Sequence, residues 1–266
     1  MADSFWSKNR IEKTIKRFME VHAHSHTARK KWTHYFWEFL MLFLAVFCGF
    51  MAEYQLEHKI ERDREKQFML SMISDLQNDL ENIKTTNAIK KRGVQIADSL
   101  LELFNSPDLK DRSGLIYYYG RLFSATHHAF YMTDGTLTQL KNAGGFRLIN
   151  KRAVVDSILF YDNLYRQLKT NEDILYYRQL EDYRAVMIRI FDINIFNTMI
   201  SDETGIIMPK GNPPLFNNSK ELINEFLMRV HLARRNTNNI IKMDLVKLES
   251  KAQGLIKMIK REYHLK

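Results

Sequence analysis

A single apolar segment near the N-terminus constrains this chain more than any other feature of its sequence. Residues 39–52, FLMLFLAVFCGFMA, contain no charged side chain, and mainly apolar and aromatic residues extend the run back to Thr33, interrupted by His34 and Glu38. A helix needs about twenty such residues to cross the hydrocarbon core of a bilayer. We therefore predict a transmembrane helix over residues 32–52.

The residues that flank this segment favour a membrane span over the core helix of a soluble protein, which is the alternative for so short an uncharged run. Trp32, Tyr35 and Trp37 lie at its N-terminal end, as aromatic residues do at membrane interfaces, and they follow the basic residues 29–31. The next Lys or Arg on the other side is Lys59. Because positive flanks stay in the cytoplasm, we expect a bacterial inner-membrane protein with a cytoplasmic N-terminus and a periplasmic C-terminal domain.

A cleaved signal peptide is the main alternative to an uncleaved anchor. About thirty residues precede the apolar run, and its small residues Gly49 and Ala52 are one position too far apart for an A-x-A-like cleavage site. Phe47, directly before the single cysteine Cys48, also differs from a lipoprotein processing site. We therefore expect the segment to remain as an anchor in the lipid bilayer.

The net charge of +9 is concentrated before the anchor. Residues 1–31 hold eight Lys and Arg side chains against three acidic ones, whereas charges of both signs are interspersed later. This distribution suits a cytoplasmic tail beside anionic lipid and argues against a nucleic-acid partner. Ile11, Ile15 and Phe18 recur there at helical spacing, which indicates an amphipathic surface helix; a disordered basic tail is the alternative.

The composition indicates that residues 53–266 form an all-α domain. Four prolines and ten glycines are few for 266 residues, and the 45% of hydrophobic residues is enough for a core. The sequence predicts a helix that continues from the anchor to Phe104, with a loosening near Thr85, Thr86 and Gly93, a helix over residues 113–127, and a short one over 136–142 that ends at Gly144 and Gly145.

Two later segments repeat apolar residues in alternating steps of four and three. We expect Asn150 to cap the first, and Asn218, with Glu221 three residues later, to cap the second. A Gly- and Pro-rich loop over residues 201–217 separates them. Such stripes must be buried against other helices, so the sequence predicts an elongated antiparallel helical bundle after the transmembrane helix.

Two stretches of the chain resemble a known family. They are ARKKWTHYFWEFLMLFLAVFCGFMAEYQLEHKIERDREKQFMLSMISDLQNDLENI and TLTQLKNAGGFRLINKRAVVDSILFYDNLY, about a third of the chain together. Both are similar to an uncharacterised family of bacterial single-pass membrane proteins that carry a domain of unknown function. The resemblance implies an N-terminal anchor and an extracytoplasmic helical domain, and it supplies no activity or site residue.

Glu38 is a candidate functional residue, because an ionisable group within a membrane span is costly and often functional. It lies one helical turn from His34, near the cytoplasmic end of the span. One N-in span with an acidic residue is similar to the stator-type subunits of proton-driven machines, although we find no peptidoglycan-binding signature. Glu38 is therefore either an interfacial residue or part of a proton pathway.

Histidines and tyrosines supply the remaining candidate sites. His22, His24 and His26 alternate along the tail and are the candidates for a transition-metal site; a polar linker is the alternative, and we predict no metal. A second cluster could line a ligand pocket or pack in the core; it comprises Tyr117, Tyr118, Tyr119, His127, His128, Tyr131 and Asp134, with Tyr118, His127 and His128 as the ligand candidates.

These features predict a binding protein rather than an enzyme, because the sequence contains no catalytic, phosphate-loop or cofactor motif. The leading hypothesis is a membrane-anchored extracytoplasmic interaction or scaffold protein, which associates with itself or with a membrane or periplasmic protein. A small-molecule sensing or binding module is the alternative, and a proton-pathway subunit that uses Glu38 is the third hypothesis.

Overall fold

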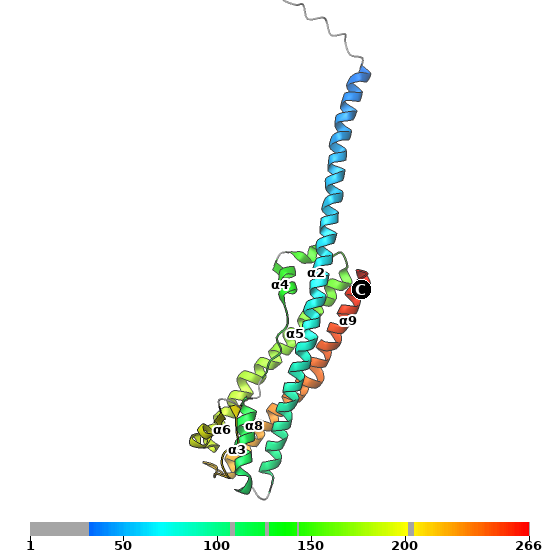
Figure 1. Cartoon of the computed structure of the whole chain (residues 1–266). Coiled ribbons are helices and arrows are strands. Elements are labelled where there is room, and N and C mark those ends of the chain that lie inside the picture. The colour runs from blue at the N-terminus through cyan, green and yellow to red at the C-terminus, as the bar shows by residue number, and fades with distance from the viewer. Residues whose placement is uncertain (1–31, 107–109, 126–127, 143, 202–204, 266) are drawn as a thin grey trace, which may run out of the picture. The chain divides into compact units, whose positions relative to one another are not determined.

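The computed structural model describes residues 32–106, 110–125, 128–142, 144–201 and 205–265 (Figure 1). The chain divides into two compact units, Met1–Ile60 and Glu61–Lys266. The described part of the first unit is helical, and the second unit is a helical bundle with one very short hairpin. The predicted all-α fold is confirmed.

In the first unit, helix α2 (Trp32–Phe104) presents apolar side chains to its surroundings. Phe39, Met41 and Leu42 are each about two-thirds exposed. An 18-residue window of the helix has a mean hydropathy of 1.9, and none of that window is buried by described residues. Among the described residues, α2 is the one helix long and apolar enough to cross a membrane.

In the second unit, α2 continues without the loosening that we predicted near Thr85, Thr86 and Gly93. Thr86 and Gly93 are buried, because they belong to the face of α2 that packs against the bundle. A glycine costs about 1 kcal/mol in a helix interior, and packing on both sides of this position outweighs that cost. The stripe of apolar side chains that begins at Met69 supplies most of this packed face.

Two further long helical segments complete the bundle among the described residues (Figure 1). They are α5 (Arg152–Ile174), η3 (Leu175–Leu180) and α6 (Glu181–Ile190), followed later by α8 (Lys220–Asn239), η4 (Ile240–Leu245) and α9 (Val246–Glu262). Because α5 packs on α9 and α6 packs on α8, the two segments run antiparallel.

Shorter elements connect these segments. They are η1 (Lys110–Arg112), α3 (Ser113–Ala125), α4 (Gly135–Asn142), η2 (Gly145–Leu148), α7 (Ile193–Thr198), β1 (Ile200–Ser201) and β2 (Gly205–Ile206). The strands form an antiparallel pair in which Ile200 lies opposite Ile206. We predicted a loop over residues 201–217, which contain all of this hairpin except Ile200, because two-residue strands leave no periodic pattern.

Both η3 and η4 are π-helical, and each corrects the register of its long segment. In the first segment the buried side chains reach Leu168, Glu172 and Leu175 in steps of four and three, and among the side chains whose burial is described the next is Leu180, five residues on. A π-helical turn closes i→i+5 hydrogen bonds and so accommodates one extra residue. Leu180 and Tyr183 therefore return to the core.

Helix α3 packs against α6 through a close approach at Gly120. The hydroxyl of Tyr183 donates to the carbonyl oxygen of Gly120 (2.7 Å). A Cβ atom at Gly120 would lie 2.8 Å from Cζ of Phe191, closer than side chains approach one another. A larger residue at this position would therefore force the ring of Phe191 to shift.

Carboxylates on α2 hold the segment between α3 and α5 by its backbone. Asp79 accepts the N–H of Thr133 (2.6 Å), and Asp75 accepts the N–H of Thr136 (2.9 Å) in the first turn of α4. Glu65 accepts both the backbone N–H (2.7 Å) and the side-chain amide (3.0 Å) of Asn150. Side chains from a distant helix therefore satisfy donors that the segment cannot satisfy locally.

Both predicted helix caps were wrong. Asn150 does not cap α5, because its side chain is bonded to Glu65, and Lys151 occupies the N-cap position without a side-chain bond. Helix α8 has Ser219 rather than Asn218 as its N-cap. The neighbouring Asn217 accepts the N–H of Ser219 (2.9 Å).

Replacing Asp79 with alanine should destabilise the fold strongly. Asp79 is fully buried, and besides Thr133 it accepts the hydroxyl of Tyr161 (2.6 Å), so Asp79→Ala leaves the buried hydroxyl of Tyr161 and the half-buried N–H of Thr133 without this acceptor. We expect a loss of about 3 kcal/mol in the free energy of unfolding, measured by urea denaturation. Glu102→Ala, at an exposed position of the same helix, should stay close to wild type; equal losses would contradict this role.

The contribution of Asp79 to the stability of the fold should also depend on pH. Burial raises the pKa of Asp79 above its usual value of 3.8, despite the opposing hydrogen bonds from Thr133 and Tyr161. The folded state therefore holds the proton more tightly than the unfolded chain. We expect the difference in unfolding free energy between wild type and Asp79→Ala to fall as the pH rises from 3.8 through the raised pKa; a pH-independent difference would contradict it.

Candidate functional site

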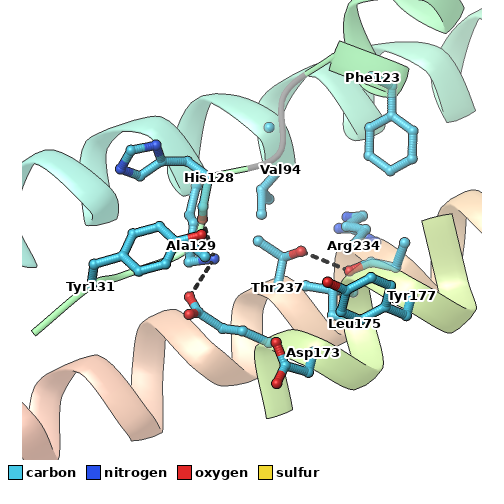
Figure 2. Close-up of a pocket in the computed structure, with 14 residues that line it drawn as sticks. Val94, Phe123, His128, Ala129, Tyr131, Asp173, Leu175, Tyr177, Arg234 and Thr237 are labelled. Atoms are coloured by element: carbon cyan, nitrogen blue, oxygen red, sulfur yellow. Dashed lines mark hydrogen bonds and ion pairs between the residues drawn. The ribbon is translucent and has the colours of Figure 1, made fainter. Parts of the chain in front are cut away.

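A cavity of about 430 Å³ lies in the second unit, where α2, α3, α5, η3, α8 and the segment after α3 meet (Figure 2). Ligand pockets in proteins are about 300–1,000 Å³ in volume. The cavity is lined by Lys90, Gly93, Val94, Phe123, His128, Ala129, Tyr131, Glu172, Asp173, Leu175, Tyr177, Ala233, Arg234 and Thr237. Its size and its mixed polar and apolar wall make it the candidate functional site.

A buried ion pair forms part of the cavity wall. The ammonium group of Lys90 lies 2.8 Å from Oε1 of Glu172, and both side chains are less than one-tenth exposed. Lys90 also donates to the carbonyl oxygen of His128 (2.8 Å), and Glu172 accepts the N–H of Phe130 (3.0 Å). The pair therefore connects α2, α5 and the segment after α3 at one point.

A second cation on the cavity wall comes from α8. Arg234 is about one-third exposed, and its Nε lies against a carboxylate oxygen of Asp98 on α2. Thr237, one helical turn further on, donates its hydroxyl to the backbone carbonyl of Ala233 (2.8 Å). The guanidinium group has five donors in a planar fork, so the two terminal nitrogens supply donors beyond the one that faces Asp98.

Exposed tyrosines and an acidic side chain lie at the open part of the cavity. Tyr131 and Tyr177 are 69% and 67% exposed, and Figure 2 shows them on opposite sides of the cavity. Asp173 on α5 lies 3.8 Å from Lys169, in an ion pair with both side chains about half exposed. The ring of Tyr131 and the carboxylate of Asp173 are therefore accessible to a ligand.

The π-helical segments adjoin this site. Leu175 and Tyr177 belong to η3, and Thr237 lies three residues before η4. A smaller hollow of about 230 Å³ lies between the two π-helical segments, where the amide of Asn171 donates to Asp244 (2.9 Å). Single π-helical turns in α-helices often accompany functional sites, which is consistent with a binding role for the cavity.

The tyrosine and histidine cluster from the sequence analysis separates in the structure. His128 and Tyr131 line the cavity. Tyr117 is buried in the core, where it donates to the carbonyl of Pro214 (3.1 Å). Tyr118 lies on α3, with its ring centroid 5.6 Å from that of Tyr119. Asp134 lies just before α4, and His127 lies outside the described residues.

The candidates near the anchor are only partly described. His34 and Glu38 lie together on α2, with 3.6 Å between Nε2 and Oε1, and both are about half exposed. The structure thus brings together the pair that the sequence analysis considered, and the proton-pathway hypothesis stays a prediction. His22, His24 and His26 lie outside the described residues.

Sequence reasoning missed the ion pair, although a signal for it exists. Glu172 lies four residues after Leu168, in step with the buried stripe of its helix, and Lys90 lies four residues after the buried Thr86. Charged residues at buried positions are rare unless they are paired. Two charges of opposite sign, each in step with a buried stripe, are therefore candidates for a pair.

Comparison of the chain with protein-family models, with curated proteins and with solved structures finds no match. Interpretation of the site therefore rests on its own residues.

Removing one partner of the ion pair should cost more than removing both. Lys90→Met leaves the carboxylate of Glu172 buried without its cation, and we expect it to lower the unfolding free energy by about 3–5 kcal/mol. Lys90→Met combined with Glu172→Leu should recover much of this loss, because no buried charge remains. Urea denaturation measures both values, and Lys91→Met, at the adjacent exposed position, is the control. Additive losses in the double variant would contradict the pairing.

Proposed function

We propose that this chain is a membrane-anchored binding protein whose helical domain holds a small molecule in the cavity between α2, α5 and α8. The observation that carries the proposal is the buried Lys90–Glu172 ion pair in the wall of a 430 Å³ cavity. A buried ion pair contributes little net stability compared with apolar residues of the same size. Its presence beside a cavity is better explained by recognition of a ligand.

The anchor belongs to the same proposal. The apolar part of α2 suits a single membrane span, and its basic flank favours a cytoplasmic N-terminus. The domain that contains the cavity is then periplasmic, at the inner membrane of a bacterium. A ligand would reach it from the periplasm.

A bound small molecule should accompany the protein through purification. We expect native mass spectrometry of the full-length chain, extracted gently from membranes of its own source cells, to show a small added mass. Val94→Phe places a ring in the cavity and should remove that mass, whereas Leu70→Phe adds the same ring at an exposed position of α2 and should retain it. No added mass in any of the three proteins would refute the proposal.

An interaction protein, our leading hypothesis from the sequence, is the second candidate, favoured by exposed apolar side chains in the second unit. Ile188, Ile193 and Phe216 are each more than three-fifths exposed. The N–H of Phe216 donates to the carbonyl of Ile190 (2.9 Å), which brings Phe216 beside the segment that carries the two isoleucines. Clustered exposed apolar residues mark interaction surfaces.

A second copy of the chain is the partner that this surface suits best. The ion pairs between α6 and α8, Arg189–Glu225 and Arg229–Asp182, carry both signs in equal number, so two copies would meet without net repulsion. We expect native mass spectrometry to show a dimer that Phe216→Ser with Ile193→Ser converts to monomer. Val246→Ser, at an exposed position on α9, is the control; a monomeric wild type would exclude self-association.

A further inference from the structure

We infer that the cavity binds a small zwitterion, a molecule that carries an ammonium and a carboxylate group, such as a free amino acid or a betaine. This inference rests on the proposed function, because it names the ligand class of that same cavity.

The charges on the cavity wall are balanced. Lys90 is paired with Glu172, Arg234 is paired with Asp98, and Asp173 is paired with Lys169. A ligand with a net charge would bring one uncompensated charge beside a wall whose charges are already paired, and beside the buried Lys90–Glu172 pair this is costly because the dielectric is low. A ligand with one positive and one negative charge can bind donors and acceptors of the wall without changing the net charge of the cavity.

Donors for a carboxylate lie on two sides of the cavity. Lys90 has three N–H donors, and among the described residues it contacts Glu172 with one and the carbonyl of His128 with another, so a third can serve a ligand. Arg234 faces Asp98 through Nε and has four more N–H donors on its terminal nitrogens. Charge-assisted bonds from a guanidinium to a carboxylate are among the strongest hydrogen bonds in proteins.

Partners for an ammonium group lie at the open part of the cavity. Asp173 supplies a half-exposed carboxylate, and Tyr131 and Tyr177 supply exposed aromatic rings. Figure 2 shows Asp173 below and between the two tyrosines in that view. Cations bind the faces of aromatic rings, and sites for ammonium ligands commonly use this interaction.

Isothermal titration of the full-length protein in detergent tests the ligand class. The probes are L-leucine, L-phenylalanine and glycine betaine as zwitterions, with acetate, methylammonium and glucose as probes that lack one or both charges. We expect at least one zwitterion to bind about tenfold more tightly than acetate, methylammonium and glucose. This is the difference in affinity that one charge-assisted hydrogen bond makes. Acetate, methylammonium or glucose binding as tightly as the best zwitterion would overturn the assignment.

Matched variants locate the binding in the cavity. Asp173→Asn and Arg234→Gln should each weaken binding of the zwitterion about tenfold. Asp156→Asn, which like Asp173 lies in an exposed i,i+4 pair on α5, and Arg235→Gln, beside Arg234, should leave it unchanged. Unchanged binding in both cavity variants would place the ligand elsewhere and refute the inference.

Different experimental results would refute the proposed function and the proposed ligand class. If no zwitterion binds but native mass spectrometry shows an added mass that Val94→Phe removes, the cavity binds another class of compound and only this inference is wrong. If no zwitterion binds and no added mass is found, both are wrong.

Discussion

Buried carboxylates on α2 determine how the segment between α3 and α5 lies against the bundle. Asp79 and Glu65 are almost inaccessible, and each accepts hydrogen bonds from backbone N–H groups of that segment. A buried carboxylate is tolerated only where donors surround it, and a backbone without its own helix or strand needs acceptors. The carboxylates supply the acceptors that the backbone needs, and the backbone N–H groups supply the donors that the carboxylates need, so the segment has one favourable position.

The cavity depends on the same interactions. His128 and Tyr131, two of its lining residues, belong to this segment, and Glu172 holds the segment from the opposite side through the N–H of Phe130. The π-helical turn at η3 places Leu175 on the cavity wall and returns Leu180 to the core. The site therefore arises from backbone placement by buried acids combined with a register correction in the adjoining helix.

The sequence predicts well what depends on local periodicity. Three examples depend on interactions within one helix or turn. They are the apolar run before Glu53, the stripe from Val154 to Leu168, and the helix end at Gly144, whose φ of +64° favours glycine.

Features that depend on contacts between distant segments could not be predicted in this way. Asn150 has the residue type of a helix cap, yet its side chain is used by Glu65 from another helix. The buried stripes mark Lys90 and Glu172 as candidates for pairing, but the two become partners only after α2 and α5 have packed, and no spacing rule matches one to the other. The cavity is defined by such contacts, so the sequence identified His128 and Tyr131 by type but missed the charged residues.

The second set of contacts on the ion pair explains how it could exchange partners without loss of the fold. Glu172 accepts the N–H of Phe130, and Lys90 donates to the carbonyl of His128, in addition to their mutual contact. A ligand carboxylate that drew Lys90 partly away from Glu172 would leave each group with one backbone partner. A pair without these bonds would leave each buried charge with no partner at all when it separated, at a higher cost. The backbone contacts thus make the pair suitable for recognition as well as for structure.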